Sequence, residues 1–169
     1  DKIIYATYYK PGTTTKDYTI YENWGEEKRR GVEFEIEHDF DENWGAYMNY
    51  AWQNGKTKNP NIAGSSVKES NGTDYNIPKH LLHAGINYKN DKFNGLLECQ
   101  YVSERQSPDS VTGEYGSEDA FFIVNTALNY EVAPNTTLQF GVNNIFDREF
   151  YCSSMTPGRT YYAGLRYSF

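Results

Sequence analysis

The sequence predicts an all-β chain, and specifically an antiparallel transmembrane β-barrel. Three observations predict it. Segments of about ten residues alternate between apolar and polar side chains; Gly, Pro, Asn, Asp and Ser separate those segments; and short connections alternate with long ones. Short turns at one end of the strands and long loops at the other are typical of transmembrane barrels. A soluble β-sandwich, whose strands also alternate, stays open as the alternative.

The composition combines few aliphatic residues with many aromatic ones. Aromatic residues make up 17% of the 169 residues, the formal net charge is -7 and the mean hydropathy is -0.80. Low hydropathy with net charge is typical of disordered chains, but those are poor in aromatic residues. A barrel resolves the conflict, because only one strand face is apolar and aromatic side chains gather at the two membrane interfaces. The acidic balance disfavours a nucleic-acid-binding protein, and the absence of a long apolar run excludes a transmembrane helix.

Eight strands are predicted from the alternation. They are residues 2–9, 32–40, 44–53, 82–88, 93–101, 122–132, 138–142 and 160–169. Segment 2–9 is the most ambiguous of them. In segment 32–40, Val, Phe and Ile alternate with Glu and Asp, so that four carboxylates share one face. In segment 44–53, Trp, Ala, Met and Tyr alternate with Gly, Tyr, Asn and Ala.

The later segments repeat the pattern with smaller polar residues. In 82–88 and 93–101, Leu, Ile, Cys and Tyr alternate with His, Gly, Asn, Glu and Gln. Segment 122–132 sets Phe, Val and Leu against Asn, Ala and Glu, and 138–142 continues with Leu, Phe and Val. In 160–169, Tyr, Ala, Leu and Phe alternate with Thr, Gly, Arg and Ser, with one further Tyr on the polar side. Each strand therefore has one apolar face.

The connections are of two kinds. Tight turns are predicted at 41–43, 90–91 and 133–135, and long polar loops at about 10–17, 54–76, 103–118 and 147–158. Aromatic residues gather near both ends of the strands. Near the tight turns these are Trp44, Tyr88, Phe93, Tyr130 and Phe169, and near the long loops Tyr101, Phe122 and Tyr161. Two such rows are typical of the aromatic girdles at the membrane interfaces.

Four segments resemble those of a known family, the TonB-dependent outer-membrane receptors. Residues 21–35, which contain Tyr-Glu-Asn-Trp-Gly and Gly-Val-Glu, resemble the family's N-V-G…G-V-E strand. Residues 77–80 (Ile-Pro-Lys-His) resemble the start of one of its strands, and residues 141–151 its penultimate strand with the following loop. Residues 157–169, with a terminal Phe, are similar to its closing strand. The four motifs occur in the family's order.

The resemblance implies the last eight strands of a 22-stranded plugged barrel. Residues 1–169 are then expected to be one C-terminal barrel segment, with the plug domain and earlier strands outside this chain. The polar strand faces would line the lumen with Glu33, Glu35, Glu37, Asn49, Asn87, Glu98, Asn125 and Glu131. Because few Lys or Arg residues share those faces, a wide, water-containing lumen with a plug suits them better than a narrow barrel filled by its own side chains.

The resemblance also implies a function. We expect TonB-dependent transport of a scarce nutrient, specifically a ferric siderophore, across the bacterial outer membrane. The expected partners are outer-membrane lipid, the plug domain of the same protein, the TonB complex, the barrel-assembly machinery and a small-molecule metal chelate; no nucleic acid, cofactor or bound metal is expected. The alternatives are a heme or cobalamin receptor of the same family, and a free-standing eight-stranded barrel acting as an adhesin or structural anchor. We expect no enzymatic activity, because the sequence lacks nucleophile-elbow, phosphate-loop and metalloprotease motifs.

Candidate functional residues lie in the long loops and in the last strand. Aromatic and Arg side chains suit a planar, anionic chelate, and those with suitable chemistry in the loops are Tyr75, Arg105, Tyr115, Arg148 and Tyr151. By resemblance, the barrel-assembly signal comprises Tyr161, Leu165, Tyr167 and Phe169.

Other reactive side chains are interpreted as structural. Glu33, Glu35 and Glu37 lie in a row on one strand and do not converge as metal ligands would, so we expect a solvated lumen wall in contact with basic plug residues. His80 and His83 are three residues apart on a strand and therefore point to opposite faces. Cys99 and Cys152 lack metal-site spacing and are expected to be two unpaired thiols.

Overall fold

A computed structural model describes residues 2–67, 70–73, 77–108, 115–152 and 154–169. The chain divides into two compact units. Unit 1 comprises Asp1–Gly31 and Gln53–Ile77, and unit 2 comprises Val32–Trp52 and Pro78–Phe169. Every regular element in these described stretches is a β-strand. No helix long and apolar enough to cross a membrane occurs in this part of the chain.

Thirteen strands are found in the described residues. They are β1 (Lys2–Tyr9), β2 (Lys16–Asp39), β3 (Trp44–Asn59), β4 (Ser70–Thr73), β5 (His80–Lys89), β6 (Phe93–Val102), β7 (Arg105–Pro108), β8 (Tyr115–Glu118), β9 (Phe121–Ala133), β10 (Thr136–Asn143), β11 (Tyr151–Cys152), β12 (Ser154–Met155) and β13 (Thr160–Tyr167). The main sheet has the order β1-β2-β3-β5-β6-β9-β10-β13, and β4 pairs with β3. This order is a meander of eight consecutive antiparallel strands, which confirms the predicted all-β, antiparallel barrel strands.

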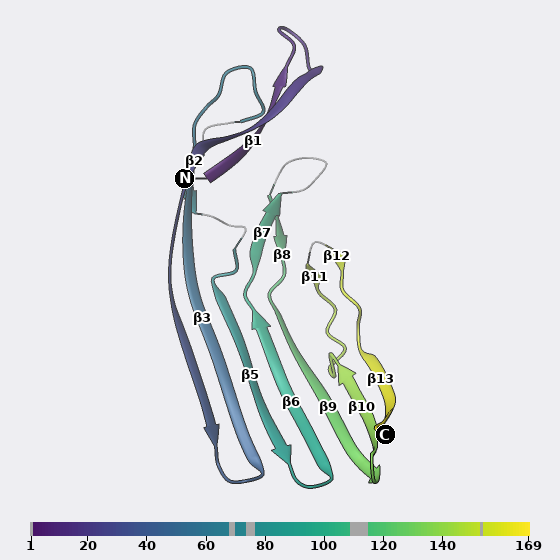
Figure 1. Cartoon of the computed structure of the whole chain (residues 1–169). Helices are drawn as coiled ribbons and strands as arrows, with labels where there is room; N and C mark the ends of the chain where they lie inside the picture. The colour runs from purple at the N-terminus through teal and green to yellow at the C-terminus, as the bar shows by residue number, and fades with distance from the viewer. Residues whose placement is uncertain (1, 68–69, 74–76, 109–114, 153) are drawn as a thin grey trace. The chain divides into compact units, whose positions relative to one another are not determined.

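Tight turns join the strands of unit 2 at one end, and the β7–β8 and β11–β12 hairpins lie at the other (Figure 1). Short polar side chains close the turns. Asp41 Oδ1 accepts hydrogen bonds from the backbone N–H groups of Asn43 and Trp44 at 2.7 and 2.8 Å, and Asn90 Oδ1 accepts one from Phe93 at 2.8 Å. In the β9–β10 turn, Asn135 has φ 62°, a conformation that Asn tolerates better than most residues. All three predicted tight turns are confirmed.

The register of unit 2 places the apolar residues of neighbouring strands on one face. At the tight-turn end, the rings of Trp44 and Tyr88 are 4.8 Å apart and those of Tyr88 and Phe93 are 6.0 Å apart. Phe93 lies opposite Tyr130 on β9. The predicted aromatic row at this end is therefore continuous across four strands.

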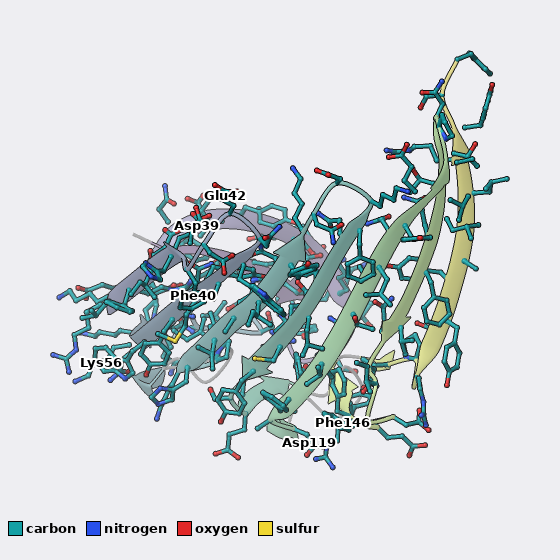
Figure 2. The ribbon with its side chains drawn as sticks, turned by 90° about the horizontal axis from the view of Figure 1, so that it is seen from below. Asp39, Phe40, Glu42, Lys56, Asp119 and Phe146 are labelled. Carbon is teal, nitrogen blue, oxygen red and sulfur yellow. The ribbon has the colours of Figure 1, made fainter. Side chains whose placement is uncertain are left out.

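A second aromatic row lies toward the hairpin end of the same face. Tyr50 pairs with Leu82, Leu82 with Tyr101, and Tyr101 with Phe122. Between the two rows are smaller aliphatic residues, among them Leu97, which is 46% exposed. We call this the outer face of unit 2. Figure 2 views the sheet from below, with Asp39, Phe40 and Glu42 labelled at the β2–β3 turn.

The opposite, inner face is polar and contains two close contacts between a glycine and a tyrosine. The ring of Tyr162 on β13 lies over Gly141 on β10, so that a Cβ added there would be 2.0 Å from Tyr162 Cζ. In the same way, the ring of Tyr47 on β3 lies over Gly85 on β5, with 2.6 Å to the added Cβ. Gly is needed where another side chain covers the backbone this closely.

Unit 1 contains the buried apolar residues of the described structure. Ile4 and Ala6 on β1 pack with Val67, and Tyr8, Ile20, Trp24 and Ile62 surround them. Loop residues 64–66 bind the end of β1: Tyr9 N–H donates to the Gly64 carbonyl at 3.1 Å, and Ser66 N–H to the Thr7 carbonyl at 2.8 Å. A small conventional core is therefore confined to this unit among the described residues.

The strands extend further than the sequence predicts. The second predicted strand, 32–40, is the end of β2, which begins at Lys16, and β3 continues past residue 53 to Asn59. The long loops predicted at 54–76, 103–118 and 147–158 contain β4, the β7–β8 hairpin and the β11–β12 hairpin. These extensions are held by backbone pairing, and their sequences lack the regular apolar–polar alternation on which the prediction depends.

Candidate functional site

The five predicted ligand-contact residues fall on three connections. Tyr75 lies outside the described residues. Arg105 begins β7 and Tyr115 begins β8, so both belong to one hairpin. Arg148 and Tyr151 belong to the connection between β10 and β13, residues 144–159, which we call the closing loop. The β7–β8 hairpin and the closing loop lie at the same end of the unit 2 strands (Figure 1).

Asn144 holds the beginning of the closing loop. Its side chain binds the backbone of Arg148 on both sides: Nδ2 donates to the Arg148 carbonyl at 2.8 Å, and Oδ1 accepts from the Arg148 N–H at 2.9 Å. The N–H of Asn144 itself donates to Asn125 Oδ1 at 2.9 Å. Asn144 is 5% exposed, whereas Arg148 is exposed. The backbone of Arg148 is therefore fixed while its guanidinium faces solvent.

Asp147 joins the beginning of the closing loop to its end. Its Oδ1 accepts a hydrogen bond from the Arg159 N–H at 2.6 Å, and its Oδ2 lies 3.5 Å from the Arg159 guanidinium. The Arg159 N–H, and also the charge of its guanidinium, hold the pKa of Asp147 below its usual range. A Cβ at Gly158 would be 2.6 Å from Asp147 Oδ1, so this contact requires glycine there.

The middle of the closing loop packs against β9. The rings of Phe150 and Phe121 are stacked with centroids 4.1 Å apart and an interplanar angle of 19°. Thr156 Oγ1 donates to the Phe150 carbonyl at 2.7 Å. Phe150 therefore anchors the loop between the two exposed candidate residues, Arg148 and Tyr151.

The guanidinium of Arg105 has a partner within its own hairpin. Its Nε donates to Glu118 Oε2, and Glu118 is 3% exposed. An ionised carboxylate at this depth needs a paired cation. Arg105 therefore stabilises the base of the β7–β8 hairpin and differs in this respect from Arg148, for which the described residues provide no ion-pair partner.

A polar network crosses the inner face of unit 2. Tyr47 Oη donates to Glu98 Oε2 at 3.2 Å, and His83 Nε2 lies 3.2 Å from the same oxygen and 3.3 Å from the Tyr47 hydroxyl. Asn125 Nδ2 donates to Glu98 Oε1 at 3.2 Å. Since Asn125 also accepts the Asn144 N–H, the network runs from β3 through β5, β6 and β9 to the closing loop.

The two histidines have partners that the sequence did not reveal. His83 belongs to the inner network, whereas His80 Nδ1 lies 2.8 Å from the hydroxyl of Tyr50, which is on the outer face. The prediction that they point to opposite faces is confirmed. Cys99 is a free thiol, as predicted. The structure does not describe the side chain of Cys152, so the prediction for that residue is untested. In the described parts of the chain, no three His, Cys, Asp or Glu side chains converge as metal ligands.

A hollow of about 430 Å³ lies beside this network. Its polar lining comes from Glu33 and Glu35 on β2, Asn49 on β3, His83 on β5 and Gln100 on β6. The hollow therefore combines two carboxylates with imidazole and amide groups, and aromatic and aliphatic residues complete its lining. Of the three carboxylates predicted to form a row on one strand face, Glu33 and Glu35 border this hollow and Glu37 does not.

Comparison with known families identifies the chain. Residues 1–145 match the family described as TonB dependent receptor-like, beta-barrel. The chain belongs to the TonB-dependent receptors. Proteins of this family are transporters and receptors, not enzymes.

Solved structures of TonB-dependent receptors share the fold. The siderophore receptor PiuA from Acinetobacter baumannii has a TM-score of 0.70 at 18% identity, over 96% of this chain and 24% of that one. The ferric-catecholate import receptor Fiu from E. coli K12 has a TM-score of 0.68 at 19% identity, over 97% and 23%. The copper transporter OprC has a TM-score of 0.66 at 19% identity, over 98% and 27%. The chain thus spans about a quarter of these barrel proteins.

The residues that fix the closing loop of this TonB-dependent receptor chain were missed by the sequence analysis. Asn144 and Asp147 both have φ 54°, and Asn and Asp are the non-glycine residues that most readily take that conformation. The Asn-Asn-Ile-Phe-Asp run is therefore a sequence signal for a fixed turn. Nothing in the alternation pattern indicates that Asn125, nineteen residues before Asn144, binds this turn.

The four predicted assembly-signal residues share the outer face at the end of the chain. Tyr161, Leu165 and Tyr167 lie opposite Val142, Leu138 and Thr136 on β10. The rings of Tyr167 and Phe169 are 5.7 Å apart. All four side chains are exposed, which leaves them accessible from the outer side of the sheet.

Proposed function

We propose that the chain forms eight strands of the wall, and several extracellular connections, of a bacterial outer-membrane receptor that takes up a ferric siderophore. The observation that carries the proposal is the division of unit 2 into an apolar outer face with two aromatic rows and a polar inner face with a hydrogen-bonded network. A lipid-facing wall around an aqueous lumen requires this division. The family membership supports the same assignment.

Lipid contact explains the exposed apolar residues. Val32, Phe34, Leu138, Phe140 and Leu165 are each at least 45% exposed. Soluble monomers rarely expose contiguous apolar patches of more than a few hundred Å². In a bilayer, the same residues contact acyl chains, and the aromatic rows lie at the two interfaces.

The inner face suits a plug domain of the same full-length protein. Glu33 and Glu35 border the hollow and form no ion pair with another residue of the described stretches. Basic plug side chains, together with water, would balance these charges at lower cost than burial without a partner. The plug, the earlier strands and a segment that contacts TonB belong in this proposal to the rest of the receptor, and the barrel has twenty-two strands.

The ligand assignment depends on the loop residues. Arg148 is an exposed guanidinium on a fixed backbone, and Tyr151 is an exposed aromatic ring in the same loop. An arginine and nearby aromatic rings recognise planar, anionic groups well. Tyr75, Arg105 and Tyr115 would complete the ligand contacts. The siderophore receptor PiuA and the ferric-catecholate receptor Fiu share the fold, as does the copper transporter OprC.

Transport would then proceed from outside to inside. The ferric chelate binds to the closing loop and the β7–β8 hairpin, and force from the TonB complex rearranges the plug to open a path through the lumen. Unit 2 acts as a rigid wall during this step. Tyr161, Leu165, Tyr167 and Phe169 present the terminal strand to the barrel-assembly machinery before transport begins.

Uptake by the full-length receptor tests the proposal. Cells that lack other iron receptors and express this one would be given ⁵⁵Fe bound to a tris-catecholate, to citrate or to a trihydroxamate, with and without TonB. We expect TonB-dependent accumulation of iron from at least one chelate. Uptake of heme, cobalamin or copper, with none of iron, would assign a different cargo. Folded barrels in the outer membrane without TonB-dependent uptake of any cargo would contradict a transport function.

A further inference from the structure

We propose that Asn144 is a positioning residue that presents Arg148 to the anionic part of the ligand. This inference rests on the proposed function, because it assigns to Arg148 the recognition of a negatively charged chelate. It goes beyond that function by naming the side chain that determines where the guanidinium is held. Figure 2 labels Phe146, which lies between Asn144 and Arg148 in the chain and is 70% exposed.

The geometry around Asn144 fixes the backbone of Arg148 and leaves its side chain available. The two hydrogen bonds from Asn144 bind both the N–H and the carbonyl of Arg148. The Asp147 N–H also donates to the Asn144 carbonyl at 2.9 Å, which closes the intervening turn. A side chain on an ordered backbone loses less conformational freedom when it binds a ligand. We call these two hydrogen bonds from Asn144 to Arg148 the clamp. The clamp therefore increases the affinity for an anionic ligand that the Arg148 guanidinium can supply.

Only asparagine meets both requirements of position 144. The backbone has φ 54°, which Gly and Asn adopt at the lowest cost. The side chain must donate one hydrogen bond and accept another four residues away. Asp accepts but does not donate, Gly does neither, and Gln places its amide one methylene further out.

Asn125 holds the backbone of Asn144 in place. Asn125 accepts the Asn144 N–H through Oδ1 and donates to Glu98 through Nδ2. An ionised carboxylate only accepts hydrogen bonds, so Glu98 fixes which side of the Asn125 amide faces Asn144. Glu98 is in turn bound by Tyr47. The position of Arg148 therefore depends on the rigid strands of the wall and not on the loop alone.

The substitution Asn144→Gly tests the side-chain hydrogen bonds of the clamp without disturbing the backbone conformation at position 144. It keeps a residue that tolerates φ 54° and removes both side-chain hydrogen bonds. Asn135→Gly is the matched control, because Asn135 has φ 62° at the opposite end of β10. Purified full-length receptor would be prepared as wild type, N144G, R148A, the N144G/R148A double variant and N135G. Fluorescence quenching would give Kd for ferric citrate and a ferric tris-catecholate, both anionic.

We expect N144G and R148A each to raise Kd for the anionic chelate about tenfold, as expected for losing a hydrogen-bonded charge contact worth about 1.4 kcal/mol. The double variant should bind like R148A alone, because a clamp that acts through Arg148 has nothing left to position. N135G should bind like the wild type. Asn144→Asp, which keeps the contact with the Arg148 N–H, should recover part of the affinity.

Two results would overturn the inference. One is an N144G effect that is as large in the R148A background as in the wild type, since the loss would then not act through Arg148. The other is amide exchange of Arg148 that is equally slow in N144G and N135G, since the clamp would then not order the backbone. If the wild type binds neither ferric chelate, the proposed ligand is wrong. In that case, amide exchange at Arg148 that is faster in N144G but unchanged in N135G would still support the clamp.

Discussion

The carboxylate of Asp147 accepts a hydrogen bond from the backbone N–H of Arg159 at 2.6 Å, and so joins the two ends of the closing loop. Gly158 permits the approach, because any side chain there would meet the Asp147 oxygen. The loop that carries Arg148 and Tyr151 is therefore closed by one carboxylate at its base. This contact adds a charged group to the Asn144 and Phe150 contacts that hold the same loop.

Substitution of Asp147 should loosen the closing loop without unfolding the barrel. In Asp147→Ala the acceptor is lost, and a residue with φ 54° acquires a side chain that disfavours this conformation. We expect faster amide exchange at Arg159 and in the loop, with unchanged exchange in β9 and β10. Asp147→Asn keeps a neutral acceptor and should show a smaller change. Asp91→Asn, in the β5–β6 turn, provides the matched control, and an equal loosening of the loop in D91N would contradict this role.

The same contact predicts a dependence on pH. The pKa of Asp147 is lowered in the folded loop by the Arg159 N–H, with the guanidinium charge adding to the effect. A lowered pKa stabilises the fold above the unfolded pKa of about 4, and this contribution is lost as the pH falls through the folded value. Exchange in the loop, corrected for intrinsic rates, should thus be constant from pH 7 to pH 5 and rise below about pH 4. In D147N the rise should be absent.

Gly141 should be intolerant of any side chain because Tyr162 covers it. Gly141→Ala places a Cβ 2.0 Å from Tyr162 Cζ, so the ring must leave its position over β10. Overpacking of this kind costs about 1–3 kcal/mol, and the urea midpoint of the folded barrel should fall. Gly164→Ala is the matched control, because its Cβ would meet only Gln139, at 3.3 Å or more. Equal midpoints for G141A and G164A would contradict the close contact.

The assignment of faces predicts opposite outcomes for two neighbouring leucines on β6. Leu97 lies on the outer face opposite Ile86 and Thr126, whereas Leu96 lies on the inner face opposite Asn87 and Ala127. Leu97→Arg places a charge in lipid, which costs about 2–4 kcal/mol at the bilayer midplane. We expect little folded L97R and nearly normal L96R, measured as the heat-modifiable barrel band from outer membranes. More folded L97R than L96R would show that Leu96, and not Leu97, lies on the face in contact with lipid.

The strands with one apolar and one polar face could be predicted from the sequence. The alternation in 82–88, 93–101 and 122–132 reports directly on which side chains lie on the apolar face and which on the polar face, so β5, β6 and β9 were found nearly to their ends. Alternation does not mark the first half of β2, because residues 16–31 lack a regular apolar–polar repeat, and only the resemblance of residues 21–35 to a family strand indicated it. The strands of the long hairpins were missed for the same reason.

The candidate site was only partly predictable. Arg148 and Tyr151 were selected by residue type, and the structure places both exposed on one anchored loop. The roles of Asn125, Asn144 and Asp147 depend on contacts between residues up to twenty-seven positions apart, which local sequence patterns do not indicate. The partner of Arg105 was hidden likewise, because Glu118 reaches it only through the pairing of β7 with β8.

Nitroxide accessibility at two adjacent positions of β6 tests the wall most directly. Cys99 pairs with Ala84 and Val124 on the outer face, and Gln100 pairs with His83 and Ile123 on the inner face. A nitroxide would be attached either at Cys99 in a C152S background or at Gln100→Cys in a C99S/C152S background, in full-length receptor reconstituted into lipid. We predict that the label at 99 collides mainly with oxygen, which concentrates in lipid, and that the label at 100 collides relatively more with a water-soluble nickel complex. Equal accessibilities, or the opposite order, would contradict a strand that separates lipid from an aqueous lumen.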